Sequence, residues 1–129
     1  MSVDLLLDTN QLLWLVRGDE RIAWLRDVVE DSASTVTVSS VALSEIAVKH
    51  AIGKLPDDVA KVRAAARRLG VLELDFTANH AEQLAEMPLH HRDPFDRMLI
   101  AQALSQDYVI ATSDREFAQY EGLRIHGAA

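Results

Sequence analysis

Residues 3–10 read VDLLLDTN, a nearly continuous apolar run from Val3 to Leu7 that is followed at once by an aspartate, Asp8. A strand that is buried on both faces of a parallel sheet has such a run, whereas a strand with one solvated face alternates apolar and polar residues. The run therefore predicts a central strand of a mostly parallel sheet. Asp8 is expected at the carboxyl end of that strand.

Segments typical of helices and strands alternate along the rest of the chain. Helices are expected over residues 10–17, 20–30, 41–52, 57–69, 77–87, 93–104 and 114–120, and further strands over residues 36–39, 71–74, 108–111 and 123–125. Ser40 and Asp93 are suited to cap the helices that follow them. This alternation predicts an α/β fold in which helices cover both faces of the sheet. Because no linker, repeat or biased tract interrupts it, one domain over residues 1–129 is expected.

Composition narrows the possible chemistry. The chain has no cysteine, so any metal ion would be held by oxygen or histidine ligands, and the five histidines lack the spacing of a zinc motif. The net charge of -7 argues against a protein that grips a nucleic-acid duplex through a broad basic face. No apolar run approaches the roughly 20 residues of a membrane span, and no secretory signal is recognisable at residue 1, so a cytoplasmic protein is expected.

Four acidic residues are expected at one edge of the sheet. Asp8 ends the first strand, and Asp114 follows the strand over residues 108–111. Asp96 falls in the first turn of the helix before that strand, and Glu45 falls in the first half of the helix after the second strand. Open α/β sheets bind ligands beyond the carboxyl ends of their strands, where the strand order reverses. The four acids are therefore predicted to meet there.

Each acid also has an ordinary structural explanation. Asp8 and Asp114 are good helix caps, the helix dipole favours Asp96, and a single glutamate such as Glu45 usually faces water. Together, however, these acids would concentrate negative charge unless a cation neutralised it. Mg²⁺ or Mn²⁺, held by one or two carboxylates and a substrate phosphate, would do so and would activate a water molecule for attack on a phosphodiester.

Four sequence runs carry a resemblance to a known family. They are LLLDTNQLLWL (residues 5–15), VSSVALSEIAVK (residues 38–49), HRDPFDRMLIAQA (residues 91–103) and IATSDREF (residues 110–117). In this order and spacing they resemble a PIN domain of the VapC toxin type, and the resemblance extends over nearly the whole chain. It implies a three-layer α/β/α sandwich and a metal-dependent endoribonuclease from a type II toxin–antitoxin pair. It also implies a homodimer and inhibition by a cognate VapB-like antitoxin that occupies the acidic cleft.

The resemblance assigns roles to the acids. Asp8, Glu45, Asp96 and Asp114 match the first to fourth acids of the family, with Asp8 and Asp96 as the direct metal ligands. Glu45 and Asp114 are then expected to act through water or by orienting a base. Asp93 is the rival to Asp96, but Asp93 is already explained as a helix cap, and the family pattern places its acid directly before the segment RMLIAQA.

Supporting residues are less distinctive. Asn10 and Thr112 stand where such proteins often have polar residues that orient the acids, although both types are ordinary in turns. Arg92, Arg97 and Arg115 are close to the acids in sequence and are candidates for phosphate contacts, although surface charges usually just face solvent.

A few other residues have both a possible functional role and an ordinary structural explanation. Lys49 is a further candidate for a phosphate contact, with solvated surface charge as the ordinary reading. Trp14 and Trp24 could stack on bases, but their place in apolar helical stripes favours packing.

Two other classes of protein remain open. One is another magnesium-dependent phosphoryl-transfer domain, receiver-like or dehalogenase-like, although no DxDx[TV] motif follows the first strand. The other is a module that keeps the fold and binds RNA or protein without catalysis.

Overall fold

The structure is a computed structural model that describes residues 3–90 and 93–126. Its centre is a sheet whose strands are β1 (Asp4–Leu7), β2 (Thr35–Ser39), β3 (Leu72–Leu74), β4 (Val109–Ala111) and β5 (Arg124–His126). The strand order is β3-β2-β1-β4-β5, and every neighbouring pair is parallel. The predicted parallel sheet, with the run after Val3 in its middle, is thereby confirmed.

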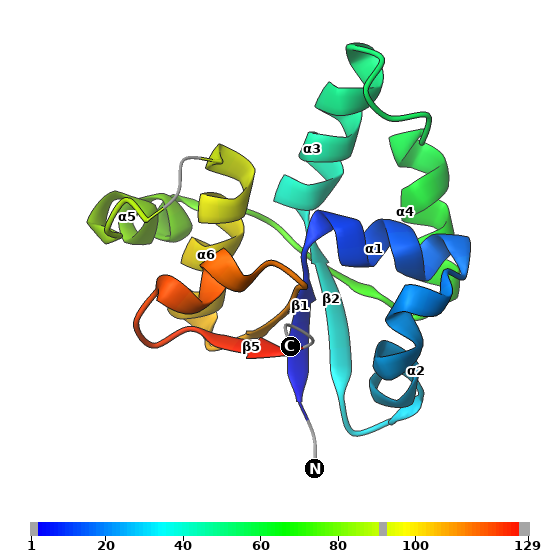
Figure 1. Cartoon of the computed structure of the whole chain (residues 1–129), viewed down its shortest axis with the longest axis horizontal. Helices are drawn as coiled ribbons and strands as arrows, with labels where there is room; N and C mark the ends of the chain where they lie inside the picture. Colours follow the sequence, from blue (N-terminus) through cyan, green and yellow to red (C-terminus); the bar gives the residue numbers. More distant parts are fainter. Residues whose placement is uncertain (1–2, 91–92, 127–129) are drawn as a thin grey trace.

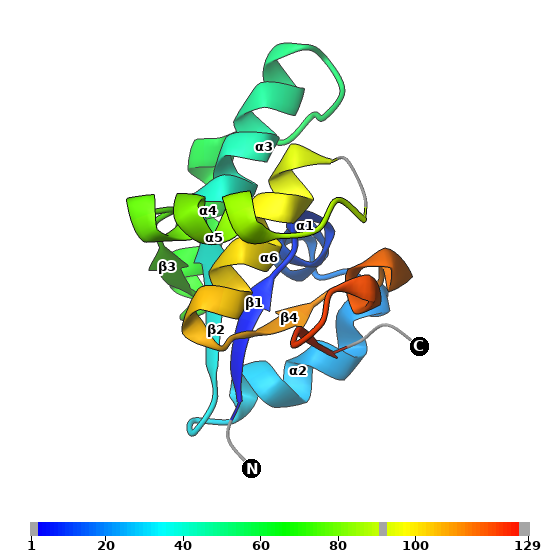
Figure 2. The ribbon, with the colours of Figure 1, turned by 90° about the vertical axis from the view of Figure 1, so that its left-hand side faces the viewer.

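Helices cover both faces of this sheet. They are α1 (Thr9–Arg17), α2 (Ala23–Glu30), α3 (Ser40–Ala51), α4 (Val59–Arg68), α5 (Ala78–Glu86) and α6 (Pro94–Gln106), with the short 3₁₀ helices η1 (Glu20–Ile22) and η2 (Arg115–Gln119). Figure 1 shows α1, α2 and α4 on one side of β1 and β2, and α5 and α6 on the other. Turned by 90°, Figure 2 shows α5 and α6 in front of the sheet. The expected three-layer α/β/α sandwich is confirmed.

The central strand is buried on both faces. Leu5 and Leu7 belong to the core beneath α1 and α2, and Leu6 belongs to the core beneath α6. None of the three side chains is exposed, and burying each leucine contributes about 1.5–3 kcal/mol. This double burial is why the sequence of β1 shows no alternation, and it fixes the position of Asp8 at the end of the strand.

Most helix ends lie where the sequence predicts them. Asp8, Asp58, Thr77 and Asp93 each accept a hydrogen bond from a backbone N–H of the helix that follows. Gly18 ends α1 in the left-handed conformation, with φ 69°, which glycine adopts at little cost.

Three local predictions are corrected. Ser39, rather than Ser40, caps α3, and the Ser40 hydroxyl instead accepts a hydrogen bond from the backbone N–H of Phe76. The helix predicted over residues 20–30 begins as η1, because Asp19 caps a tight first turn. The last strand lies one residue later than expected, at Arg124–His126. In the part of the chain that the structure describes, no helix is long and apolar enough to cross a membrane.

Candidate active site

Four acidic side chains from distant parts of the sequence line one cavity of about 150 Å³. Each comes from a different part of the fold: Asp8 from the end of β1, Glu45 from α3, Asp96 from α6 and Asp114 from the segment after β4. We call this the acid cavity; its other lining residues are Thr9, Asn10, Lys49, Asp93 and Phe117. The structure therefore brings together all four acids that the sequence singles out.

The sheet topology explains this meeting. From β1 the chain adds β2 and β3 on one side and then returns to add β4 and β5 on the other, so the strand order reverses between β1 and β4. Crossover helices on opposite sides of such a point leave a crevice beyond the strand ends. Asp8 and Asp114 follow the two strands that flank the reversal, and the backbone N–H of Asp8 donates to the carbonyl of Ala111 at 3.0 Å.

Asp8 is both a helix cap and a member of the acid cavity. Its Oδ1 accepts from the backbone N–H of Gln11 at 2.8 Å, and the hydroxyl of Thr112 also hydrogen-bonds to it. The Thr112 Oγ1 in turn accepts from the backbone N–H of Asp114 at 3.0 Å. The fully buried Thr112 thus connects two acids, which agrees with the orienting position expected for it. Burial is the main cause that raises the pKa of Asp8 to about 6.

Glu45 differs from most single glutamates on helices, whose side chains face water. Its side chain is buried, with one oxygen accepting from the Thr9 hydroxyl at 2.5 Å and the other paired with the Lys49 ammonium at 2.5 Å. Lys49 is therefore more than a solvated surface charge: its side chain is partly exposed, but its ammonium is paired with Glu45. The hydrogen bond that Lys49 donates to Glu45 raises the pKa of Lys49. The i,i+4 spacing of this pair was the sequence signal for the contact.

The sequence offers both Asp93 and Asp96 as the third acid of the site, and the structure gives these two residues different positions. Asp93 is exposed and caps α6, accepting from the backbone N–H of Asp96 at 3.0 Å. Asp96 is half-buried, and burial together with the charges of Asp93, Glu45, Asp8 and Asp114 raises its pKa to about 7. Asp96 is thus more buried than Asp93 and within range of the charges of the other four acids, which supports the preference for Asp96.

The remaining expected site residues lie in different places. Asn10 is exposed and lines the acid cavity. Arg97 donates to the Pro88 carbonyl at 2.9 Å and to the Tyr120 hydroxyl at 3.4 Å, and neither Arg97 nor Arg115 is among the described residues that line the cavity. Arg92 lies outside the described residues.

The donor set fits a hard divalent cation. The ionisable side chains that line the acid cavity are five carboxyl groups and one lysine, and the charges of neighbouring carboxylates help to raise the pKa of Asp8 and of Asp96. Among residues 3–90 and 93–126, no three Asp, Glu or His side chains are grouped to hold an ion by themselves. The arrangement suits an ion held by two carboxylates, Asp8 and Asp96, with water completing its shell, which is how Mg²⁺ usually binds.

The raised pKa of Asp8 predicts how stability depends on pH in metal-free protein. In the unfolded chain Asp8 ionises near pH 3.8, and in the folded protein only near pH 6. Between these values the unfolded state binds fewer protons, so the free energy of unfolding should fall as pH rises, by at most about 3 kcal/mol for this group. Half-buried Asp96 adds a smaller decrease that extends toward pH 7.

Urea unfolding in EDTA at pH 4.5 and pH 7.5 measures this effect. Asp8→Asn keeps a capping side chain but cannot ionise, so the variant should be more stable than the wild type at pH 7.5 and nearly equal to it at pH 4.5. Equal pH profiles for the two proteins would show that Asp8 has an ordinary pKa.

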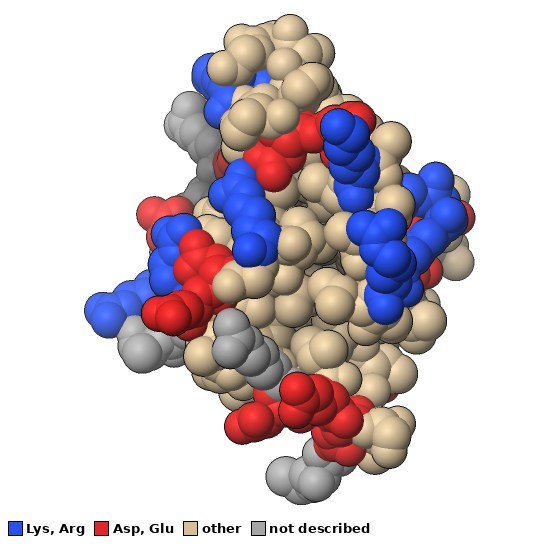
Figure 3. Space-filling view, turned by 90° about the vertical axis from the view of Figure 1, so that its right-hand side faces the viewer, with Lys and Arg blue, Asp and Glu red and all other residues tan. Residues whose placement is uncertain are grey.

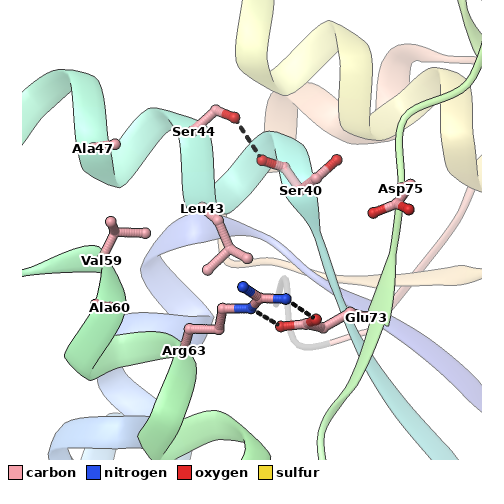
Figure 4. Close-up of a pocket in the computed structure, with 9 residues that line it drawn as sticks. All are labelled: Ser40, Leu43, Ser44, Ala47, Val59, Ala60, Arg63, Glu73 and Asp75. Atoms are coloured by element: carbon pink, nitrogen blue, oxygen red, sulfur yellow. Dashed lines mark hydrogen bonds and ion pairs between the residues drawn. The ribbon is translucent and has the colours of Figure 1, made fainter.

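A larger cavity, of about 460 Å³, lies between α3, α4 and β3 (Figure 4). Two of the three charged side chains that line it are paired with each other: Arg63 donates to both carboxylate oxygens of Glu73, at 2.6 and 2.8 Å, and the third is Asp75. That pairing lowers the pKa of Glu73 to about 2. Despite its size, this cavity contains none of the predicted acids and offers no cluster of like charge, so we assign the chemistry to the acid cavity.

Charged side chains of both signs lie on one face of the molecule. Figure 3 shows this face, on which basic side chains form separate groups with acidic ones beside some of them. Among the described residues, ion pairs such as Arg17–Asp57 and Arg21–Asp19 neutralise part of the positive charge. No continuous basic surface crosses the described part of this face.

The chain was compared with known proteins. The model of the PIN domain family matches residues 5–123. No match was found among curated proteins.

Similar solved structures cover almost the whole chain. VapBC2 from Rickettsia felis, bound to a promoter DNA fragment, has a TM-score of 0.72 and 15% identity over 96% of this chain and 98% of that chain. DNA-bound VapBC from Salmonella typhimurium has a TM-score of 0.68 and 23% identity over 96% and 97%. VapBC-1 from Haemophilus influenzae has a TM-score of 0.67 and 20% identity over 96% and 97%. At these identities the likeness shows a shared fold.

Proposed function

Because this chain belongs to the PIN-domain family, we propose that it is a metal-dependent endoribonuclease, the toxin of a type II toxin–antitoxin pair. The observation that carries the proposal is the acid cavity, where acids from four separate elements line one small space at the strand-order reversal. Oxygen-only donors with unbalanced negative charge suit a hard cation, and a hard cation suits a phosphodiester.

In the proposed reaction, Asp8 and Asp96 would hold Mg²⁺ or Mn²⁺. When bound, such an ion would supply positive charge for a phosphate oxygen and lower the pKa of a water molecule. The Oδ1 of Asp114 accepts from the backbone N–H of Glu116, and its other oxygen would accept a hydrogen bond from the attacking water. Glu45 orients a second water and is held in place by Thr9 and Lys49. The water oxygen bonds to phosphorus, the P–O3′ bond breaks, and the proton passes to O3′, which leaves a 5′-phosphate and a 3′-hydroxyl.

We also propose a VapB-like antitoxin as partner and a homodimer as the assembled form. The similar structures named above are VapBC toxin–antitoxin assemblies, which supports the partner assignment. A basic antitoxin segment entering the acid cavity would pair with its carboxylates and exclude substrate. A small protein encoded beside this chain should therefore co-purify with it and suppress its activity.

Protein stripped with EDTA and incubated with RNA or with single-stranded DNA of the same sequence tests the proposal. RNA should be cut only after Mg²⁺ or Mn²⁺ is restored, at internal sites, with 5′-phosphate ends. Binding of RNA without cutting under any ion would instead favour a non-catalytic module. An aspartyl phosphate trapped from a phosphate donor would favour another kind of phosphoryl-transfer domain.

A further inference from the structure

We propose that a second cavity, lined by Gln11, Trp14 and Ser113, binds a nucleobase of the RNA beside the phosphate that is cut. The inference rests on the proposed function and adds a base-binding subsite to it. This second cavity measures about 200 Å³ and adjoins the acid cavity.

The two cavities share part of their walls. Asp8, Asn10 and Asp114 line both of them. A phosphate bound at these acids carries a nucleoside on either side. One of these two nucleosides would place its base in the second cavity. Asn10, exposed between the two spaces, is positioned to contact the sugar that joins them.

Gln11 is one of the residues that line the second cavity, and its side chain carries a buried hydrogen-bonding atom that is unused. Its side chain is fully buried, and its Nε2 donates to the Ser113 hydroxyl at 2.9 Å. Its Oε1 has no hydrogen-bond partner among the described residues. Buried polar atoms are rarely left unpaired, because an unmade hydrogen bond is costly. The amino and imino groups on the Watson–Crick edges of unpaired bases are suitable donors to this amide oxygen.

Trp14 supplies an aromatic surface in the same cavity. The guanidinium of Arg21 lies 4.2 Å from the centroid of its ring, and Asp19 holds Arg21 through an ion pair of 2.6 Å. This contact holds the guanidinium against the indole ring, and the charge of Arg21 is balanced by Asp19. Aromatic rings in such places stack on RNA bases of any sequence.

A comparison with Trp24 shows how Trp14 differs from a tryptophan that only packs in the core. Both tryptophans pack against the core beneath α1 and α2, as the sequence predicts. Trp24, however, makes an edge contact with the ring of His126, whereas Trp14 also lines a cavity beside the acids. An aromatic ring together with an unpaired amide oxygen is the combination by which proteins bind single, unstacked RNA bases.

Steady-state cleavage of a short RNA tests the subsite. Gln11→Leu removes the acceptor at similar volume, and Trp14→Leu removes the ring. Both should raise KM about tenfold or more and shift the preferred base next to the cut, with little change in kcat. Trp14→Phe keeps an aromatic ring, so its KM should stay near that of the wild type. Trp24→Phe is the control, because Trp24 lies in the packed position. If the wild type cuts RNA while both leucine variants keep its KM and base preference, the subsite is wrong and the nuclease assignment stands.

A binding measurement makes the test independent of catalysis. The chain has two tryptophans, so Trp24→Phe combined with Asp8→Asn leaves Trp14 as the single tryptophan, excited selectively at about 295 nm, in a protein that is not expected to cut RNA. Trinucleotides of one base each should quench its fluorescence, and Gln11→Leu should weaken that binding about tenfold for the preferred base. Absence of quenching by all of them would overturn the subsite, whether or not the wild type proves to be a nuclease.

Discussion

Replacing Asp8 with asparagine should lower the rate of RNA cleavage about 1000-fold or more in the presence of Mg²⁺ or Mn²⁺. A cation stabilises a transition state of phosphate attack by several kcal/mol, and each 1.4 kcal/mol corresponds to roughly a factor of ten. Asparagine caps a helix as well as aspartate does, so α1 should stay folded and only the charge on the ligand is lost.

Asp58→Asn is the matched control for this variant. Asp58 also caps a helix, accepting from the backbone N–H of Ala60 at 3.2 Å, but it lies outside the acid cavity. Its substitution should leave the cleavage rate within about twofold of the wild type. The rates are compared on proteins with identical circular dichroism spectra. Wild-type cleavage by the Asp8 variant would remove this residue from the proposed centre.

A second large effect should separate two neighbouring aspartates. Asp96→Asn is expected to lower cleavage by a similar factor, about 1000-fold, because Asp96 lines the acid cavity and is the other proposed ligand. Asp93→Asn keeps the cap of α6 and changes an exposed side chain, so its loss should be below about tenfold.

Calorimetric titration with Mn²⁺ adds a readout that does not depend on RNA. Asp93→Asn should keep the affinity for the ion, whereas Asp96→Asn should weaken it at least tenfold, the lower end of what a lost outer-shell partner costs at other metal sites. If Asp93→Asn instead loses more activity and more Mn²⁺ affinity than Asp96→Asn, the metal ligand is Asp93.

The sequence predicted the fold well because its signals are local. The unbroken apolar run of β1 indicates burial on both faces, and Asp93 followed by Pro94 indicates the start of α6. The position of Asp8 and Asp114 at the strand-order reversal then followed from a general property of parallel sheets. One error, Ser40 in place of Ser39, concerns which of two adjacent serines caps α3, and the Ser40 hydroxyl is instead bound by the backbone N–H of the distant Phe76.

The site was less predictable because its contacts join distant parts of the chain. Nothing local shows that Thr9 donates to Glu45 or that Thr112 connects Asp8 with Asp114. Arg97 illustrates the reverse case: it is adjacent to Asp96 in sequence, yet it points to the carbonyl of Pro88. On a helix, neighbouring residues face different directions, so closeness in sequence is a poor guide to closeness at a site.

The pairing of β1 with β4 has a consequence for the newly made chain. A ribosome adding about 5–20 residues per second needs roughly 5 to 20 seconds to proceed from Asp8 to Asp114. Until then the first strand lacks its later neighbour, the hydrogen bond from Asp8 to the carbonyl of Ala111 cannot form, and the fourth acid is missing. The acid cavity is therefore incomplete while the preceding residues are being made, and any activity that needs all four acids begins only after Asp114 has been added.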